Sequence, residues 1–416
     1  MSASLAVPTT SNKSAWLESW LTGLPAPHGE LQQVQQRGRE ALARLPLPSS
    51  RQEDWRFTDL GLLSSLALVQ PAAPAVSTLP PAEVGAFRLA WNGTADALAG
   101  QSLPDGLQAL SPAEVAQGLG HTLAAAGCEQ HWPVELNHAA AERVLALRVT
   151  SRSQVSLELI SAAAEGLQAL RLLLLLEEKA QLDLSQLVDA QGSGLHSLVI
   201  EAHLARGARL HHGLVALGRS DAAVLAHVAL EQEPESDAKL CSVSAGWGLS
   251  RLEPRAVQVD GEANTVVRGL QVVAGQQIAD THSFVEFKGP EGQLDQLHKA
   301  VAAGQGRSVF NGAVRVPRAA QRTNAAQLSR SLLLSDRARI DTKPELEIVA
   351  DDVKCAHGAT VSSLQTDELF YLQSRGIDAD QAAGLLQRAF CEEVLRDLPA
   401  AARAWCPLER LLEVQT

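Results

Sequence analysis

The sequence contains few cysteines, and those it has are far apart. None of the five belongs to a Cys-x-x-Cys pair, and their number is odd. A disulfide framework or a structural zinc site needs paired or regularly spaced cysteines, so the sequence argues against both and favours a reducing compartment. The five are Cys128, Cys241, Cys355, Cys391 and Cys406.

Aromatic residues and nucleotide-binding motifs are scarce as well. Aromatic side chains make up 4% of the 416 residues, and Tyr371 is the single tyrosine. The chain also lacks the Gly-x-x-x-x-Gly-Lys-Ser/Thr phosphate loop, so we expect no ATP hydrolysis here. We expect a protein that is not an enzyme.

Basic residues are too few for a nucleic-acid-binding protein. The chain has 35 basic and 47 acidic residues and a net charge of −12, whereas binding phosphates needs a basic face. The longest purely aliphatic run, Leu172 to Leu176, is far short of the ~20 residues that cross a bilayer. The first residues do not resemble a signal peptide. We therefore expect a cytoplasmic protein that binds neither membrane nor nucleic acid.

Three regions follow one another along the chain: a helical and mixed region over 1–138, a β region over 139–365 and a helical region over 366–416. In the first region, Lys13–Leu21 and Glu30–Leu45 carry apolar residues at helical spacing. A proline-rich stretch at Leu68–Pro81 is typical of a linker.

The middle region is all β. Short alternating apolar runs end in glycine, aspartate, asparagine or proline, which is typical of strands with tight turns. Glycines at 246, 261, 275, 289, 304 and 312 predict turns. The pattern fits a sandwich or a parallel β-helix and does not choose between them. The runs are Gln181–Leu184, Leu210–Leu217, Val224–Leu230, Val266–Val273 and Ser308–Val316.

Helical spacing returns in the last region. Gly376 stands where a helix ends, and Asp378 stands where the next helix begins. Leu385, Leu386 and Phe390, with Ala389 and Val394, lie on one face of that helix. A third short helix follows Pro399 or runs from Pro407 to Val414.

The stretch Asp341–Ile377 carries the most specific signal. It reads DTKPELEI, ADDVKCAHGATV and LFYLQSRGI, and it resembles the C-terminal signature of the SufB/SufD family of iron–sulfur cluster assembly scaffolds. FNGAVRV at Phe310, AAQRTNAAQ at Ala319 and SLLLS at Ser331 are similar to preceding parts of the family core. RQEDWRFTDL at Arg51 is similar to a tryptophan-containing motif of the SufD branch.

Two departures from the SufB branch favour the SufD branch. SufB has a cysteine just before the double-leucine segment, whereas this chain reads QLSRSL at Gln327–Leu332. The Cys-Ala-His sequence at Cys355–His357 has the SufD form. The resemblance implies a right-handed parallel β-helix core flanked by N-terminal and C-terminal helical regions. It also implies a SufB-like partner, a SufC-like ATPase, and a transient iron–sulfur cluster in the complex, with no cofactor stably bound to the isolated chain.

The resemblance assigns roles to three groups of residues. His357, with Cys355, becomes a cluster-assembly ligand at the partner interface. Residues i and i+2 of a strand face the same side, so a thiolate and an imidazole can converge there on one metal ion. The residues alone also allow a structural interpretation, in which Cys355 is a small buried side chain and His357 caps the turn before Gly358. The SLLLS segment becomes the partner interface, and the last helical region docks the ATPase through Leu385, Leu386 and Phe390. The interface residues are Ser331, Leu332, Leu333, Leu334 and Ser335.

Other polar residues have simpler interpretations. Adjacent residues of a strand face opposite sides, so neither Asp351–Asp352 nor His211–His212 can share one substrate or ion, and we expect turn or surface roles for the two aspartates. Trp55, between Arg51 and Arg56, is expected to anchor the N-terminal helices to the core. A secreted-type carbohydrate-active β-helix enzyme and a homodimeric scaffold acting without SufB remain the alternative functions. A hexapeptide-repeat acyltransferase would need a strict six-residue repeat, which is absent.

Overall fold

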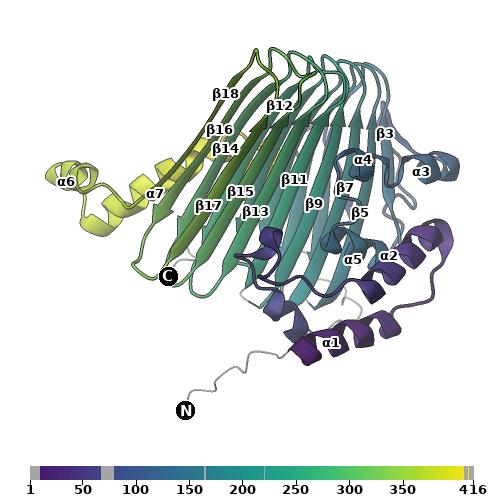
Figure 1. Ribbon diagram of the computed structural model, residues 1–416, viewed down its shortest axis with the longest axis horizontal. Coiled ribbons are helices and arrows are strands. Elements are labelled where there is room, and N and C mark those ends of the chain that lie inside the picture. Colours follow the sequence, from purple (N-terminus) through teal and green to yellow (C-terminus); the bar gives the residue numbers. More distant parts are fainter. Residues whose placement is uncertain (1–9, 67–78, 164, 220, 407–410, 412–416) are drawn as a thin grey trace.

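The computed structural model describes residues 10–66, 79–163, 165–219, 221–406 and 411. Within them the chain forms a parallel β-solenoid of about eight turns, with helices before and after it (Figure 1). The mainly-β prediction with helical termini is confirmed, and the β-helix is the correct choice over the sandwich. The predicted linker at Leu68–Pro81 lies mostly outside the described residues.

From β3 onward, consecutive strands alternate between two nine-stranded sheets, so each turn of the chain adds one strand to each sheet. The first sheet, in spatial order, contains β1 (Phe87–Ala90), β4 (Gln154–Ala163), β6 (Gln181–Ala190), β8 (Arg209–Leu217), β10 (Asp237–Ala245), β12 (Asn264–Val273), β14 (Gln293–Ala302), β16 (Asn324–Leu333) and β18 (Lys354–Ser362). The second contains β2 (Leu107–Ala109), β3 (Leu145–Val149), β5 (Gly166–Leu176), β7 (Gly194–Leu204), β9 (Ala223–Gln232), β11 (Leu249–Gln258), β13 (Ile278–Phe287), β15 (Arg307–Val316) and β17 (Arg339–Ile348).

Apolar runs interrupt the alternation in the sequence because many strands are covered on both faces. In β6, Leu182 and Leu184 point into the core between the sheets, whereas Leu187 points outward into a second cluster. The leucine run in β5 is explained in the same way, since Leu172 lies in the central core and Leu173 packs on the outer face. Parallel strands buried on both faces tolerate such continuous apolar runs.

Residues other than glycine also adopt the left-handed backbone conformation at the corners of the solenoid. Charged residues in the left-handed region recur at one corner, among them Lys179 (φ 61°), Glu235 (φ 62°) and Glu262 (φ 53°). The amide of Glu235 donates to the carbonyl of Glu262 on the next turn, 3.1 Å away. These bonds between turns hold a conformation that non-glycine residues rarely adopt.

Five of the six glycines predicted to form turns do lie in turns or bends between strands, and Gly312 does not. Gly312 is inside β15, where a Cβ atom would come within 2.3 Å of the buried amide of Gln327. Position 312 is glycine because the Gln327 side chain occupies the space that a Cβ atom would need.

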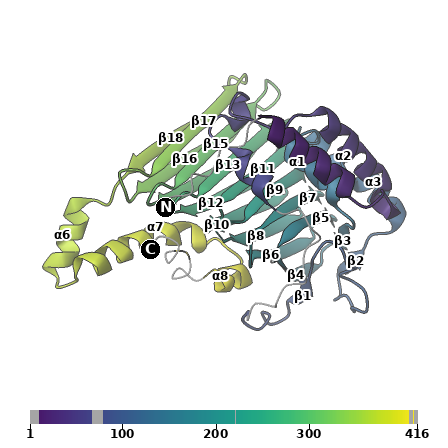
Figure 2. The same ribbon diagram turned by 90° about the horizontal axis from the view of Figure 1, so that it is seen from below.

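N-terminal helices cover the outer face of the second sheet (Figure 2). Trp20, Leu42, Trp55 and Trp132 pack there in one apolar cluster with outward leucines of the strands. The helices are α1 (Thr10–Gly23), α2 (Gln32–Arg44), α3 (Pro112–Gly118), α4 (His121–Ala125) and α5 (Trp132–Ala140), with 3-10 turns η1 (Gly29–Leu31), η2 (Glu53–Trp55) and η3 (Leu60–Ser65).

Three C-terminal helices follow the last strand: α6 (Thr366–Ser374), α7 (Ala379–Leu395) and α8 (Ala400–Trp405). Helix α8 and the second half of α7 pack on the outer face of the first sheet. The predicted start of α7 is confirmed, because the Asp378 carboxylate accepts from the amides of Asp380 and Gln381. Gly376 adopts φ +87° between α6 and α7, as expected of a helix end. Of the two predicted third helices, the one after Pro399 is confirmed, and 407–414 lies almost entirely outside the described residues.

No helix among the described residues is both long enough and apolar enough to cross a membrane.

Four buried histidines make stability depend on pH. Burial lowers the pKa of His138 and His196 to about 4 and that of His212 and His298 to about 3, because the charged ring loses its hydration. In the unfolded chain these rings titrate near ~6.5. Below that pH these rings are protonated in the unfolded chain but stay neutral in the folded one. The free energy of unfolding therefore falls as the pH falls, by roughly 1.4 kcal/mol per pH unit for each ring.

We therefore predict that His212→Gln makes stability less dependent on pH. Urea unfolding at about pH 7.5 and about pH 5.5 should show a difference smaller by roughly 1.4 kcal/mol in the variant than in the parent chain. The matched control is His121→Gln, because the side chain of His121 is 65% exposed. An unchanged difference for His212→Gln would contradict the prediction.

Candidate functional site

The solenoid ends at an uncovered turn. Among the described strands, β17 pairs only with β15, and β18 pairs only with β16, so the outer backbone edge of each is unpaired. Large apolar side chains are exposed at this end: Ile348 by 41%, Val349 by 49% and Val361 by 45%. An unpaired edge with apolar side chains is a surface suited to receive another chain.

Cys355 and His357 both lie on β18, in register with Ala325 and Gln327 of β16. Cys355 packs against the central core, so the strand alternation directs His357 to the same interior side. The structure thus brings these two predicted residues together on one face. Cys355 is partly buried and His357 is exposed, because no described turn covers β18.

A polar column inside the solenoid leads to His357. The Gln296 amide nitrogen donates to the Ser283 hydroxyl at 2.6 Å, and the Gln327 amide nitrogen donates to the Gln296 carbonyl oxygen at 3.0 Å. The Gln327 carbonyl oxygen is buried and has no hydrogen-bond partner. His357 is therefore the exposed end of a buried polar column.

Cys355 is the only cysteine that is not fully buried. Burial raises the pKa of its thiol, and a backbone hydrogen bond at Ala325 opposes that effect only in part. The thiol is therefore protonated near neutral pH and releases a proton when it binds a metal. Burial also raises the pKa of the Cys128 and Cys391 thiols to about 12, which keeps them protonated and unreactive.

The pair offers two ligands and no third. In the described part of the chain, no group of three metal-binding side chains includes Cys355 or His357. An iron ion or a cluster bound here would need further ligands from another molecule, and the open end leaves room for one.

The expected partner interface at Ser331–Ser335 lies one turn away from the edge. Ser331 and Leu332 are buried in β16, which is flanked by β14 and β18, and Leu332 packs beneath the C-terminal helices. Ser331 and Leu332 are therefore covered by the chain itself, whereas Leu333, Leu334 and Ser335 are only partly buried. A role for this segment in pairing stays a prediction.

The predicted ATPase-docking residues differ in exposure. Leu385 is 46% exposed and Leu386 is partly buried. Phe390 is fixed to the solenoid, because the Lys299 ammonium lies 4.1 Å from its ring centre and donates to its carbonyl at 2.9 Å. Sequence analysis overlooked Phe370 and Tyr371, which are 70% and 58% exposed on α6. The sequence did carry a signal for them, since two adjacent aromatic residues are unusual in a chain with few aromatic residues.

The remaining polar pairs behave as expected. His212 points inward to Gln186 at 3.1 Å, and His211 points outward to the carbonyl of Asp397 at 2.8 Å. Asp351 and Asp352 are exposed in the turn before β18.

Trp55 is buried among the N-terminal helices, and the Arg251 guanidinium stacks 3.8 Å from its ring centre. The Trp55 motif therefore anchors the N-terminal region to the second sheet.

Comparison with known proteins identifies the family. The sequence profile described as "SUF system FeS cluster assembly, SufBD core domain" matches residues 159–390. This chain belongs to the SufB/SufD family of iron–sulfur cluster assembly proteins. The resemblance seen in the sequence is thereby confirmed.

Full-length relatives place the chain near the SufD proteins of the family. It is 28% identical to the iron-sulfur cluster assembly protein SufD of Escherichia coli over 93% of this chain and 94% of that protein. It is 30% identical to Protein ABCI7, chloroplastic, of Arabidopsis thaliana over 95% of this chain and 89% of that one. An iron-sulfur cluster assembly SufBD family protein of Synechocystis is 39% identical over 56% of this chain, which spans about half (53%) of that relative.

Proposed function

We propose that this chain is the SufD-type scaffold subunit of an iron–sulfur cluster assembly complex. Its last turn stacks edge to edge on a SufB-like chain, and α6 with the start of α7 binds a SufC-like ATPase. A cluster is built at the seam, with His357 and Cys355 supplying the ligands from this side. The uncovered last turn carries the proposal, because it combines an unpaired edge with an incomplete ligand set.

The chemistry of the seam follows from these two side chains. A neutral imidazole and a thiolate are both competent iron ligands, and mixed cysteine and histidine ligation occurs in iron–sulfur clusters. Stacking a partner on β17 and β18 would bury the site, and removal from water strengthens the electrostatic interactions within it. Separation would expose the cluster again and allow its transfer.

We predict that a charge at the last turn prevents pairing. Ile348→Asp and Val361→Asp should lower the affinity for a purified SufB-like chain at least ~10-fold, because burying an unpaired carboxylate costs more than ~1.4 kcal/mol. Melting temperatures should stay within a few degrees, since both positions are 41–45% exposed. Light scattering of the mixture measures the complex.

The matched control for the last turn is Val84→Asp, a fully exposed valine just before β1. Pairing that survives both edge substitutions would remove this interface. A wild-type chain that dimerises with itself and loses the dimer in both variants would favour the homodimeric scaffold.

His357→Ala should strongly reduce cluster formation while leaving the fold intact. The side chain is exposed, so we expect a stability loss of at most ~1 kcal/mol and unchanged assembly with the partner. Cluster yield on the assembled complex, read from visible absorption after anaerobic reconstitution, should fall sharply. His121→Ala is the control, and a normal yield in His357→Ala would show that the ring is not a ligand.

Docking of the ATPase should depend on the hairpin formed by α6 and the start of α7. Deleting residues 378–416 would also strip buried side chains such as Val394 and Trp405 from the first sheet, so point substitutions are the cleaner test. Phe370→Asp and Leu385→Asp should abolish capture of a purified SufC-like ATPase and leave the SufB-like partner bound. The control is again Val84→Asp, and undiminished capture would contradict docking on this hairpin.

A further inference from the structure

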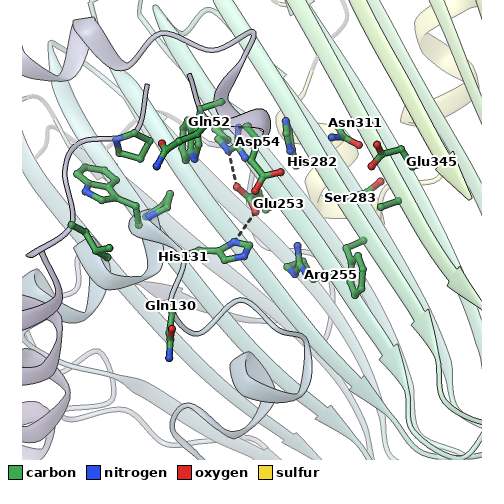
Figure 3. A pocket seen from close by; sticks show the side chains of 18 of the residues that line it. Gln52, Asp54, Gln130, His131, Glu253, Arg255, His282, Ser283, Asn311 and Glu345 are labelled. Atoms are coloured by element: carbon green, nitrogen blue, oxygen red, sulfur yellow. Dashed lines mark hydrogen bonds and ion pairs between the residues drawn. The ribbon is translucent and has the colours of Figure 1, made fainter. Parts of the chain in front are cut away.

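A pocket of about 490 Å³ lies on the outer face of the second sheet, beneath the N-terminal region (Figure 3). The chain after α2 and the residues that precede α5 form one wall. Strands β11, β13, β15 and β17 form the floor. This pocket is separate from the pair on β18, which belongs to the first sheet.

Three metal-binding side chains converge beside this pocket. His227 of β9 and Glu253 of β11 are direct neighbours in register, and His131 comes from the residue before α5. Figure 3 shows His131 and Glu253 reaching toward each other across the pocket. His131 Nδ1 lies 3.2 Å from Glu253 Oε2 and 3.3 Å from His227 Nε2, and His227 Nε2 lies 3.0 Å from Glu253 Oε2.

This triangle of donor atoms has the dimensions of a face of a metal coordination sphere. Bonds of about 2.0–2.2 Å in tetrahedral geometry separate neighbouring donors by roughly 3.3–3.6 Å. The observed 3.0–3.3 Å requires movements of only a few tenths of an ångström. Two imidazoles and one carboxylate are the donor set that zinc and ferrous iron take in sites with an open position.

The surroundings hold the carboxylate in place. Arg251 Nε donates to Glu253 Oε1 at 2.6 Å, which leaves Oε2 directed at the histidines. Arg251 Nη1 also donates to Asp280 at 2.6 Å, and His282 Nε2 lies 3.1 Å from the other oxygen of Asp280. Two buried carboxylates therefore face one guanidinium, and a divalent cation at Glu253 Oε2 would add compensating charge.

We propose that His131, His227 and Glu253 form a binding site for a single divalent transition-metal ion, with its open coordination position facing the pocket. His131 and Glu253 both line the pocket, and the His131 side chain is 32% exposed. Water or a small ligand therefore reaches the fourth position from the pocket. The proposal is independent of cluster assembly at β18, since the two sites share no residue.

Metal binding by the isolated full-length chain tests the site. Cys355→Ser with His357→Ala serves as the background, so that the end of the solenoid cannot bind the probe. Anaerobic titration with Co²⁺ should give one ion per chain, with visible d–d bands and no thiolate charge-transfer band. One equivalent of Zn²⁺ should displace it, and a parallel titration with Fe²⁺ distinguishes the two natural candidates. No stoichiometric binding of any of the three ions would overturn the proposal.

Substitutions show whether the bound ion is at these residues. Loss of an outer-shell partner typically weakens metal affinity ~10–100-fold, so His131→Ala and Glu253→Gln should weaken it by at least ~100-fold. His131→Ala is the better folded variant, because its ring is partly exposed and precedes a helix. His121→Ala, a more exposed histidine outside the triangle, should bind normally.

Thermal unfolding separates metal binding from a purely structural role. Zn²⁺ should raise the melting temperature of the background chain and of His121→Ala, but not that of His131→Ala. Equal Co²⁺ affinity in the background and His131→Ala would overturn the proposal. A loss of Co²⁺ affinity in His121→Ala as large as that in His131→Ala would also overturn the proposal, because the ion would then be bound elsewhere on the surface.

Discussion

A parallel solenoid takes its backbone hydrogen bonds from the turns before and after, and its last turn has only one neighbour. This constraint governs the end of the molecule formed by β17 and β18. Each of these strands is paired on one side, and the interior side chains of β18 are partly open to solvent because no described turn covers them. Natural sheets usually protect such edges. Here the edge carries a cysteine and a histidine, so we interpret the exposure as functional.

Much of the outer surface of the solenoid is covered by its own chain. N-terminal helices pack on the second sheet, C-terminal helices pack on the first, and Ala97, Leu98 and Leu103 pack against the core near the first turn. The last turn is therefore an uncovered end at which another β-sheet can continue the molecule. The α6–α7 hairpin projects from the same end (Figure 1), which places the proposed ATPase contact beside the proposed seam.

Sequence reasoning succeeded where a pattern is local. Alternation located strands such as Leu210–Leu217, and i, i+2 spacing placed Cys355 and His357 on one face. It could not foresee the burial of Leu332, because the C-terminal helices reach this side chain only in the folded chain. It also failed at the corners, because a charged residue such as Glu262 gives no signal for a left-handed conformation that its neighbouring turn stabilises. His131 and Glu253, 122 residues apart, meet only through the fold.

The two groups of candidate ligands differ in completeness, and that difference predicts how each would hold a metal. His131, His227 and Glu253 are donated by one chain, and two of them are fully buried, so an ion bound there could leave only through the pocket. Cys355 and His357 would supply two ligands on an exposed strand, so the affinity for a cluster would depend on what a partner adds and would be lost when that partner leaves. A scaffold must build a cluster and then release it, and only the incomplete site couples release to a change in assembly. A buried three-ligand site is suited instead to an ion that stays bound.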